Sequence, residues 1–374
     1  MDKKVKVLQI AFNDLGHGGI QSQIMSITER TRDYTDTDII VWSNKLAFYD
    51  EEFKQYGRIF RIPHYNGASI IRQKIDYFIR YFKIKKEVYK IIKEYGPYDV
   101  VHCHKFFESA PCLSAAMKAN VPIRIAHSHN TAQRIERKTV TSCLKFLYNS
   151  VYRIIIRKTA TSMIGCSKQA TNYLFGRGYG EVVYNAIETE RFDINKYNQM
   201  CHSDPYFIHV GNFNHQKNQL FLIDIFYELK KFFPNAHLCM IGQESIYQEK
   251  VKEKILEYEL AAAVDILPHD INIAQMMSQS DIFVFPSIFE GFGNVLIEAQ
   301  AMGLPCFVSE VVTKEADCGL LEFIRLSEGA TIWAEKIRDY ILNKGLNKKA
   351  VNVDRFSHKN NTNSILELYM GIKK

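Results

Sequence analysis

The chain has 374 residues, of which 47% are hydrophobic and 24% are charged. This is the composition of a folded globular protein, and it excludes an intrinsically disordered or low-complexity chain. Residues 1–198 carry 31 Lys and Arg against 19 Asp and Glu, so the net charge of +7 comes wholly from the N-terminal half. We expect that half to face an anionic partner, either a membrane surface or a nucleic acid.

The cysteine pattern and the apolar runs indicate the cellular setting. Eight cysteines are scattered along the chain with no Cys-x-x-Cys pair, which is typical of reduced thiols in a cytoplasmic protein and argues against a zinc or disulfide framework. No uncharged apolar run approaches the roughly 20 residues that span a bilayer. The expected protein is cytoplasmic and holds no metal.

The N-terminal half alternates short apolar runs with longer segments of helical spacing. The runs are rich in Val and Ile and nearly apolar throughout, as parallel strands buried on both faces are. Strands are expected at 4–12, 37–43, 99–104, 123–128 and 161–167. Strands that alternate with helices predict a doubly wound α/β domain.

A second domain of the same class is expected after a linker. Residues 189–205 are polar and end in Asp204-Pro205, and strand-like runs then resume. The expected strands are 206–213, 236–243, 281–287 and 304–311. We therefore predict domains at 1–195 and 196–356 that face each other across a cleft, with a closing helix at about 357–374 that packs back on the first domain. Ligands of open α/β sheets bind at the carboxyl ends of the strands.

The strongest motif lies in residues 281–309. A buried strand ends at 286–287, and the glycine-containing loop 290–293 leads into a helix that begins near Asn294. Glycines let the backbone approach a ligand closely, and the start of a helix attracts phosphate. Glu290 precedes the loop and Glu298 lies one turn beyond Asn294, so both carboxylates can reach one ligand, where they suit the hydroxyls of a ribose or a sugar ring. For an isolated pair of glutamates, a helix cap and a solvated side chain would be the simpler interpretation.

The wider context changes that interpretation. Glu290 and Glu298, followed by Ala299 and by Gly303-Leu304-Pro305, resemble the signature of the retaining GT-B glycosyltransferases of family 4. The resemblance covers nearly the whole chain and is strongest to the bacterial enzymes of capsular polysaccharide and exopolysaccharide biosynthesis. It also rests on Gly18-Gly19, 99–102, 127–130, 165–168, Tyr184-Asn185, and Gly211 with Lys217. It implies GT-B architecture, with two Rossmann-like domains, the acceptor on the first and the nucleotide-sugar donor on the second.

The resemblance also implies roles for individual residues. Glu290 would contact hydroxyls of the donor sugar, and Glu298 would accept hydrogen bonds from the ribose. Lys217 matches a lysine that binds the diphosphate, and its mobile point charge suits a leaving diphosphate. His129 matches a histidine near the reacting sugar. Donor or nucleotide binding is further expected at Gly291, Phe292, Gly293, Asn294, Gly211, Asn212, Gly18 and Gly19.

Two features keep alternatives open, and one argues against another ligand. His127 and His129 could instead be packed, hydrogen-bonded histidines or a metal pair, although no acidic or cysteine cluster accompanies them. Residues 16–19 lack the spacing of a dinucleotide fingerprint, which argues against NAD. Asn212 stands where the family usually has an arginine that helps to neutralise the diphosphate. The loss of that charge-assisted hydrogen bond weakens the interaction with the diphosphate by about 1.5–3 kcal/mol.

The positive excess has two centres. Residues 71–93 hold eight basic and five aromatic residues, and a second cluster follows at 134–158. Basic amphipathic helices with aromatic side chains adsorb to anionic membranes, whereas a solvated helix face is the simpler interpretation. Because the resemblance implies a lipid-linked acceptor, we expect membrane or acceptor contact, and no nucleic acid. The residues assigned to this contact are Lys83, Lys85, Lys86, Arg137 and Lys138.

Together these observations predict a hexosyltransferase-type enzyme at the inner face of the cell membrane. It would transfer a sugar, most simply from a UDP-sugar, to a lipid-linked saccharide in surface polysaccharide synthesis, with no metal or other cofactor. Two other functions remain open: a catalytically silent GT-B subunit that binds nucleotide beside an active partner, and a sugar-nucleotide epimerase.

Overall fold

In the computed structural model the chain divides into two compact units, 1–185 with 359–374 and 186–358. The structure describes residues 3–11, 13–16, 18–63, 70–131, 140–198 and 202–372, and the side chains of 70–78 and 140–145 are not among them. The described parts of the expected linker, 189–198 and 202–205, belong to the second unit, where Phe192 and Ile194 are buried.

The first unit is built on a parallel sheet with the order β3-β2-β1-β4-β5-β6-β7. Its strands are β1 Val5–Ile10, β2 Thr35–Val41, β3 Ile59–Arg61, β4 Val100–Cys103, β5 Ile123–Ser128, β6 Ser162–Gly165 and β7 Glu181–Val182. Its helices are α1 Gly19–Thr31, α2 Asp50–Phe53, α3 Ile70–Tyr95, α4 Ser109–Lys118, α5 Val140–Thr159, α6 Lys168–Phe175 and α12 His358–Tyr369.

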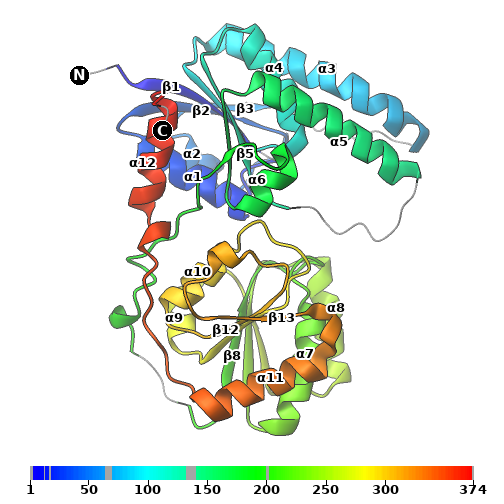
Figure 1. Cartoon of the computed structure of the whole chain (residues 1–374), viewed down its shortest axis with the longest axis vertical. Coiled ribbons are helices and arrows are strands. Elements are labelled where there is room, and N and C mark those ends of the chain that lie inside the picture. The colour runs from blue at the N-terminus through cyan, green and yellow to red at the C-terminus, as the bar shows by residue number, and fades with distance from the viewer. Residues whose placement is uncertain are drawn as a thin grey trace. The chain divides into compact units, whose positions relative to one another are not determined.

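Helices cover both faces of this sheet (Figure 1). Side chains of α3, α4 and α5 pack with Leu8, Ile40 and Val101 on one face. On the other face, α1 and the closing helix α12 pack over alternate residues of β1, β4 and β5. This two-sided burial explains why the central strands are nearly continuous apolar runs.

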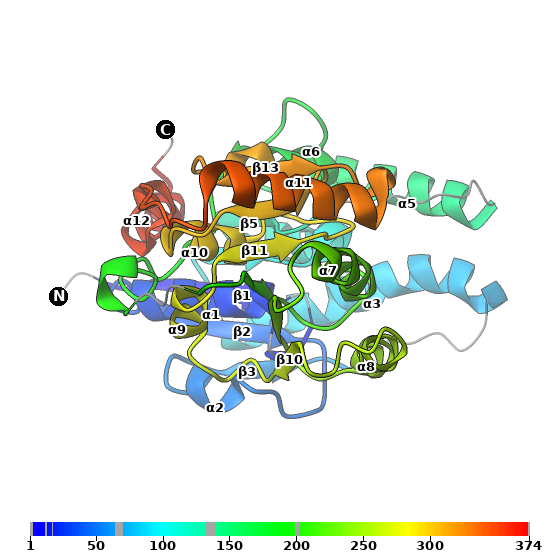
Figure 2. The same ribbon diagram turned by 90° about the horizontal axis from the view of Figure 1, so that it is seen from below.

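The second unit repeats the plan with the parallel order β10-β9-β8-β11-β12-β13. Its strands are β8 Tyr206–Val210, β9 His237–Ile241, β10 Val264–Leu267, β11 Ile282–Phe285, β12 Cys306–Ser309 and β13 Leu321–Ile324. Its helices are α7 Gln219–Phe232, α8 Ile246–Glu257, α9 Ile273–Ser278, α10 Asn294–Ala301 and α11 Gly329–Lys344. Helices α7, α8 and α11 share one core around the buried Trp333, and α9 and α10 lie on the opposite face (Figures 1 and 2).

Each sheet reverses its winding direction once, and that point determines where ligands can bind. The reversal falls between β1 and β4 in the first unit and between β8 and β11 in the second. Connections leave such a pair of strands in opposite directions, so a crevice opens at their carboxyl ends. The loops after these four strands are therefore where the functional residues are to be sought.

Candidate active site

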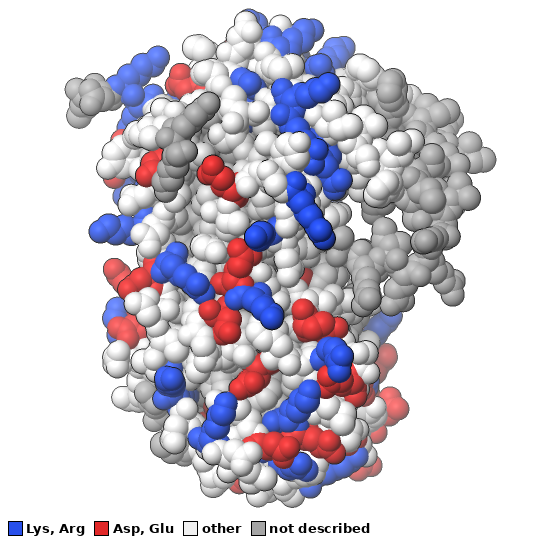
Figure 3. All heavy atoms as spheres, viewed as in Figure 1, with Lys and Arg blue, Asp and Glu red and all other residues white. Residues whose placement is uncertain are grey.

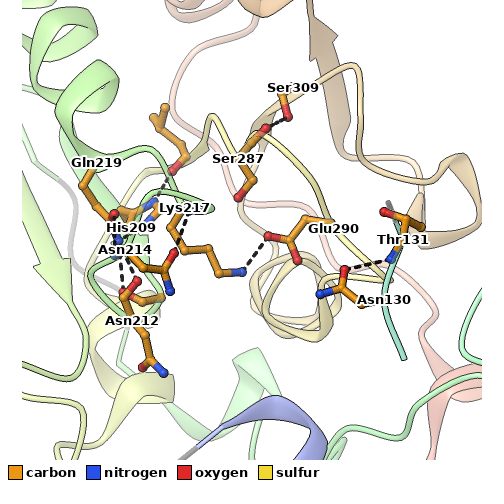
Figure 4. Close-up of polar contacts among 12 residues, drawn as sticks. Asn130, Thr131, His209, Asn212, Asn214, Lys217, Gln219, Ser287, Glu290 and Ser309 are labelled. Atoms are coloured by element: carbon orange, nitrogen blue, oxygen red, sulfur yellow. Dashed lines mark hydrogen bonds and ion pairs between the residues drawn. The ribbon is translucent and has the colours of Figure 1, made fainter. Parts of the chain in front are cut away.

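In the second unit the structure brings together two residues that lie 73 positions apart in the sequence. Lys217 follows β8 and Glu290 follows β11, so both lie at the switch point of the sheet. The Lys217 ammonium donates a hydrogen bond to Glu290 Oε1 at 2.7 Å (Figure 4). The lysine side chain is 17% exposed and the glutamate side chain only 6% exposed. Lys217 Nζ also lies 4.5 Å from the centroid of the Phe285 ring, so its charge faces a π surface.

Two residues that the sequence analysis did not single out hold the loop that carries Lys217 in place. Gln219, at the start of α7, donates to the carbonyls of Gly211 and Asn212 at 3.3 and 3.1 Å. His209, buried in β8, contacts the Gln219 amide at 3.4 Å through Nε2 and donates from Nδ1 to the Val284 carbonyl. Because burial lowers the pKa of His209 to about 4, the ring stays neutral and can accept at Nε2.

Two hydrogen bonds also connect the loop that carries Lys217 to the loop that carries Glu290. The Ile288 amide donates to the Gln216 carbonyl at 2.8 Å, and the Asn218 side chain donates to the Pro286 carbonyl at 3.1 Å. The lysine and glutamate are therefore held on connected backbone segments. Both charged groups are therefore in place at the site before a ligand arrives.

The glycine loop leads directly into α10. Gly293 has φ +83°, a left-handed conformation that a side chain disfavours, and it ends the loop at the N-terminus of the helix. That terminus, next to Gly291 and Asn294, carries the partial positive charge of the helix. The ring of Phe292 is buried against Phe356.

Glu298 lies one turn further along α10 and is half-buried. Burial raises the pKa of its carboxyl to about 7, with Arg191 and Glu188 acting in opposite directions as lesser influences. A carboxyl group that titrates near neutrality in a candidate site is a common mark of function. Gly211 and Asn212 lie beside the Lys217 loop, where Asn212 is partly exposed. A Cβ added to Gly211 would meet the Lys217 side chain at 3.2 Å, so glycine lets the lysine lie against the strand end.

In the first unit the predicted residues lie at the corresponding strand ends. Gly19 begins α1, and Gly18 caps it in an extended conformation in which an added Cβ would come within 2.4 Å of the Gln21 side chain. His129 follows β5 and is 7% exposed. Its Nε2 lies 2.6 Å from Nδ1 of His104, and its Nδ1 has no hydrogen-bond partner among the described residues.

The structure describes only part of the predicted basic surface. Lys83 and Lys86 on α3 are exposed and Lys85 is half-buried near the Tyr81 ring, whereas Arg137 and Lys138 lie outside the described residues. Some members of the basic clusters serve the fold instead. Arg153 and Arg157 bond carbonyls at the C-terminus of α6, and Arg80 pairs with Glu108. These cations are engaged by the protein and do not contribute to an open positive surface.

Ser287 is a further residue that the sequence analysis missed. It ends the β11 segment beside Glu290, and its carbonyl accepts from Ser309 at 2.6 Å. Its buried hydroxyl has no partner among the described residues. A serine after a strand is too common a pattern to have been singled out.

The two units, each a parallel sheet with its residues at the switch point, match the GT-B architecture of known glycosyltransferases. The glycosyltransferase from Rickettsia africae ESF-5 has a TM-score of 0.72 at 20% identity and covers 99% of this chain and 98% of its own. Anabaena Alr3699/HepE in complex with UDP and glucose has a TM-score of 0.71 at 17% identity, covering 98% of this chain and 100% of its own. These likenesses establish the fold.

The sequence comparisons establish the family. The model of glycosyl transferases group 1 matches residues 190–355, and the model of glycosyltransferase family 4 matches residues 18–191. EpsF of Bacillus subtilis is 30% identical over 90% of this chain and 88% of its own length. The capsular polysaccharide biosynthesis glycosyltransferase CapH of Staphylococcus aureus is 27% identical, with 79% of each chain covered. The chain belongs to the group 1/family 4 glycosyltransferases and is a hexosyltransferase-type enzyme with bacterial polysaccharide-synthesis relatives.

Proposed function

We propose that this glycosyltransferase moves a hexose from a nucleoside diphosphate sugar, a UDP-sugar in the simplest case, to a lipid-linked saccharide with retention of the anomeric configuration. The observation that carries the proposal is the Lys217–Glu290 pair beside the N-terminus of α10. One related enzyme, from Escherichia coli, is named for UDP-galactose and a diphosphoundecaprenol-linked acceptor, and it is 26% identical over 71% of this chain and 73% of its own.

The geometry supports separate roles for Lys217, Glu290 and Glu298 on one donor molecule. When the bond between the sugar carbon and the diphosphate breaks, negative charge grows on the leaving oxygen, and Lys217 and the α10 terminus stabilise it. Glu290 accepts hydrogen bonds from sugar hydroxyls, and Glu298 accepts them from the ribose. With two sources of positive charge near the diphosphate, the proposal calls for no metal ion, so a chelator should leave turnover unchanged.

A panel of UDP- and GDP-sugars, with bacterial membrane lipid as acceptor, tests the proposal directly. We expect one donor to be consumed with formation of a glycolipid of unchanged anomeric configuration. Glu290→Gln should reduce turnover by at least about a hundredfold, as loss of a contact to the reacting group does, while Glu253→Gln on the exposed face of α8 should not. Nucleotide binding without turnover of any donor would favour the silent subunit, and conversion of the donor without an acceptor would favour the epimerase.

We further propose that the first unit docks on an anionic membrane through α3 and α5. Besides Lys83 and Lys86, these helices expose large apolar side chains, of which Phe146 and Leu147 are 72% and 62% exposed. The ring contact between Tyr81 and Tyr152, at 5.6 Å, holds the two helices side by side. Exposed apolar groups beside lysines are what an interfacial helix presents to lipid. Figure 3 shows Lys and Arg side chains on the visible face of this unit.

Vesicle binding tests the docking surface. None of the described helices is long and apolar enough to cross a bilayer. We expect binding to vesicles rich in phosphatidylserine, weakened by salt and by charge reversal of Lys83, Lys85 and Lys86, because each juxtamembrane cation contributes about 1 kcal/mol. Reversal of Lys250 and Lys252 on α8 is the control and should change little. Binding that survives both the triple reversal and high salt would exclude this surface.

A further inference from the structure

Four histidines are packed together at the carboxyl ends of β4 and β5. His102 and His104 come from the β4 segment, and His127 and His129 come from the β5 segment. All four are buried, and the parallel register of these strands places them on the same face of the sheet. Gln9 is the register partner of His102 on β1 and is buried on that face as well. The cluster therefore includes His129, the histidine that we assign to the sugar site.

One arm of the cluster runs from Gln9 to His129. Gln9 Oε1 lies 2.7 Å from His104 Nε2, and since an amide oxygen can only accept, His104 carries its proton on Nε2. In a neutral imidazole the other nitrogen is then an acceptor, so His104 Nδ1 receives a hydrogen bond from His129 Nε2 at 2.6 Å. His129 therefore carries its proton on Nε2 and has a lone pair on Nδ1.

The other arm runs from Gln9 through the closing helix. Gln9 Nε2 donates to the Tyr369 hydroxyl at 2.9 Å, and that hydroxyl lies 2.9 Å from His102 Nδ1. The hydroxyl accepts from the amide, and His102 Nδ1 is the acceptor within reach of its own proton. In that arrangement the His102 proton lies on Nε2, 3.1 Å from His127 Nδ1. The amide oxygen of Gln9 thus sets the proton positions of the arm that ends at His129, and its amide nitrogen begins the other arm.

The same histidines could in principle hold a metal ion. Ligand nitrogens of His102, His104 and His127 lie within 4.8 Å of one another, and neutral imidazoles bind transition metals. However, no carboxylate or thiolate joins this group in the described part of the chain. A divalent cation would then keep its full charge in the protein interior, where desolvation is costly. The paired donors and acceptors favour a hydrogen-bonded network.

We propose that Gln9 and His104 are positioning residues that hold His129 as the neutral Nε2–H tautomer, with Nδ1 presented as an acceptor to a substrate hydroxyl. The role of His129 rests on the function proposed above. Burial also lowers the pKa of His129 to about 3 and keeps His102, His104 and His127 neutral. His129 therefore orients a hydroxyl and does not serve as a proton-donating acid near pH 7.

Nitrogen-15 NMR of the histidine-labelled full chain tests the network without any need for turnover. In the wild type we expect a protonated Nε2 and an unprotonated Nδ1 at His129, unchanged between pH 5 and pH 8, with the signal assigned by its loss in His129→Asn. Gln9→Leu removes the acceptor for His104 and should let the two tautomers of His129 mix. With about half of His129 in the acceptor tautomer, KM for the substrate that it binds rises about twofold, with kcat little changed.

Tyr369→Phe is the matched control, because it breaks the other arm and leaves Gln9 Oε1 in place for His104. It should leave the His129 tautomer unchanged. A wild-type protein that carries the proton on His129 Nδ1, or that purifies with stoichiometric zinc, would overturn the proposal. Both results are obtained on the wild type, so they do not depend on whether Gln9→Leu folds. An inactive chain with the expected tautomer would overturn the proposed function alone.

Discussion

Replacing Glu298 with glutamine should make the free protein more stable at neutral pH and above. Burial raises the pKa of this carboxyl from 4.5 to about 7, so between these values the folded chain binds a proton more tightly than the unfolded chain. Stability therefore falls as the pH rises through this window, and above it the carboxylate costs at most about 3 kcal/mol. Glutamine carries no charge and avoids that cost. We expect a higher urea midpoint for the variant at pH 8 and equal midpoints near pH 4.5.

The same substitution should weaken nucleotide binding, because the ribose hydroxyls donate to the ionised carboxylate. With a pKa near 7, about one-tenth of the wild-type protein is ionised at pH 6 and about nine-tenths at pH 8. Affinity for UDP, measured by calorimetry, should then rise about tenfold across this range in the wild type and much less in Glu298→Gln. Because the nucleotide itself titrates equally in both measurements, the comparison with Glu298→Gln corrects for that titration. Glu190→Gln, at an exposed position, is the control. Equal pH dependence in both proteins, or a less stable variant at pH 8, would refute the assignment.

Three further substitutions probe the same site. Lys217→Met removes the cation beside the buried Glu290 and should cost about 3 kcal/mol of stability; an unchanged urea midpoint would contradict this. Asn212→Arg should tighten UDP binding severalfold in low salt if this position faces the diphosphate, and unchanged calorimetric affinity would place it elsewhere. Gly293→Ala should cost about 1–2 kcal/mol because of its positive φ and should also weaken UDP binding, whereas Gly345→Ala should show only the stability loss.

The central strands could be predicted from sequence, and the edges of the sheets could not. Every predicted strand lies in the interior of a sheet, whereas β3, β7, β10 and β13, which were not predicted, are the four edges. A nearly continuous apolar run is typical of a strand buried on both faces, and only interior strands are buried in this way. Edge strands are short and carry exposed charge, as Asp265 does in β10 and Glu181 does in β7. Their sequences resemble loops because half of their surface faces water.

The separate motifs of the candidate site could be predicted from the sequence, but which residues of distant motifs contact one another could not. The glycine loop and the two glutamates lie close together in the sequence, so their spacing indicates their chemistry. The pairing of Lys217 with Glu290 depends on β8 and β11 being neighbours, which is a property of strand order. Likewise, the network behind His129 needs Gln9 and Tyr369, which are 360 residues apart. No local pattern connects such residues, since only the packing of α12 on the sheet brings them together.

The Lys217–Glu290 pair also bears on how tightly the nucleotide is held before and after transfer. In the free protein the cation expected at the diphosphate is already bonded to the carboxylate expected at the sugar. A nucleotide without a sugar can draw the lysine away, but it leaves Glu290, whose side chain is 6% exposed, with a weakened ion pair. An intact donor offers hydroxyls to Glu290 at the same time and avoids that cost. We therefore expect the donor to bind more tightly than its nucleotide product, and Glu290→Gln to narrow the difference by strengthening nucleotide binding. Calorimetry with both ligands on both proteins measures this, and a difference that persists in the variant would mean that the pair does not restrain the lysine.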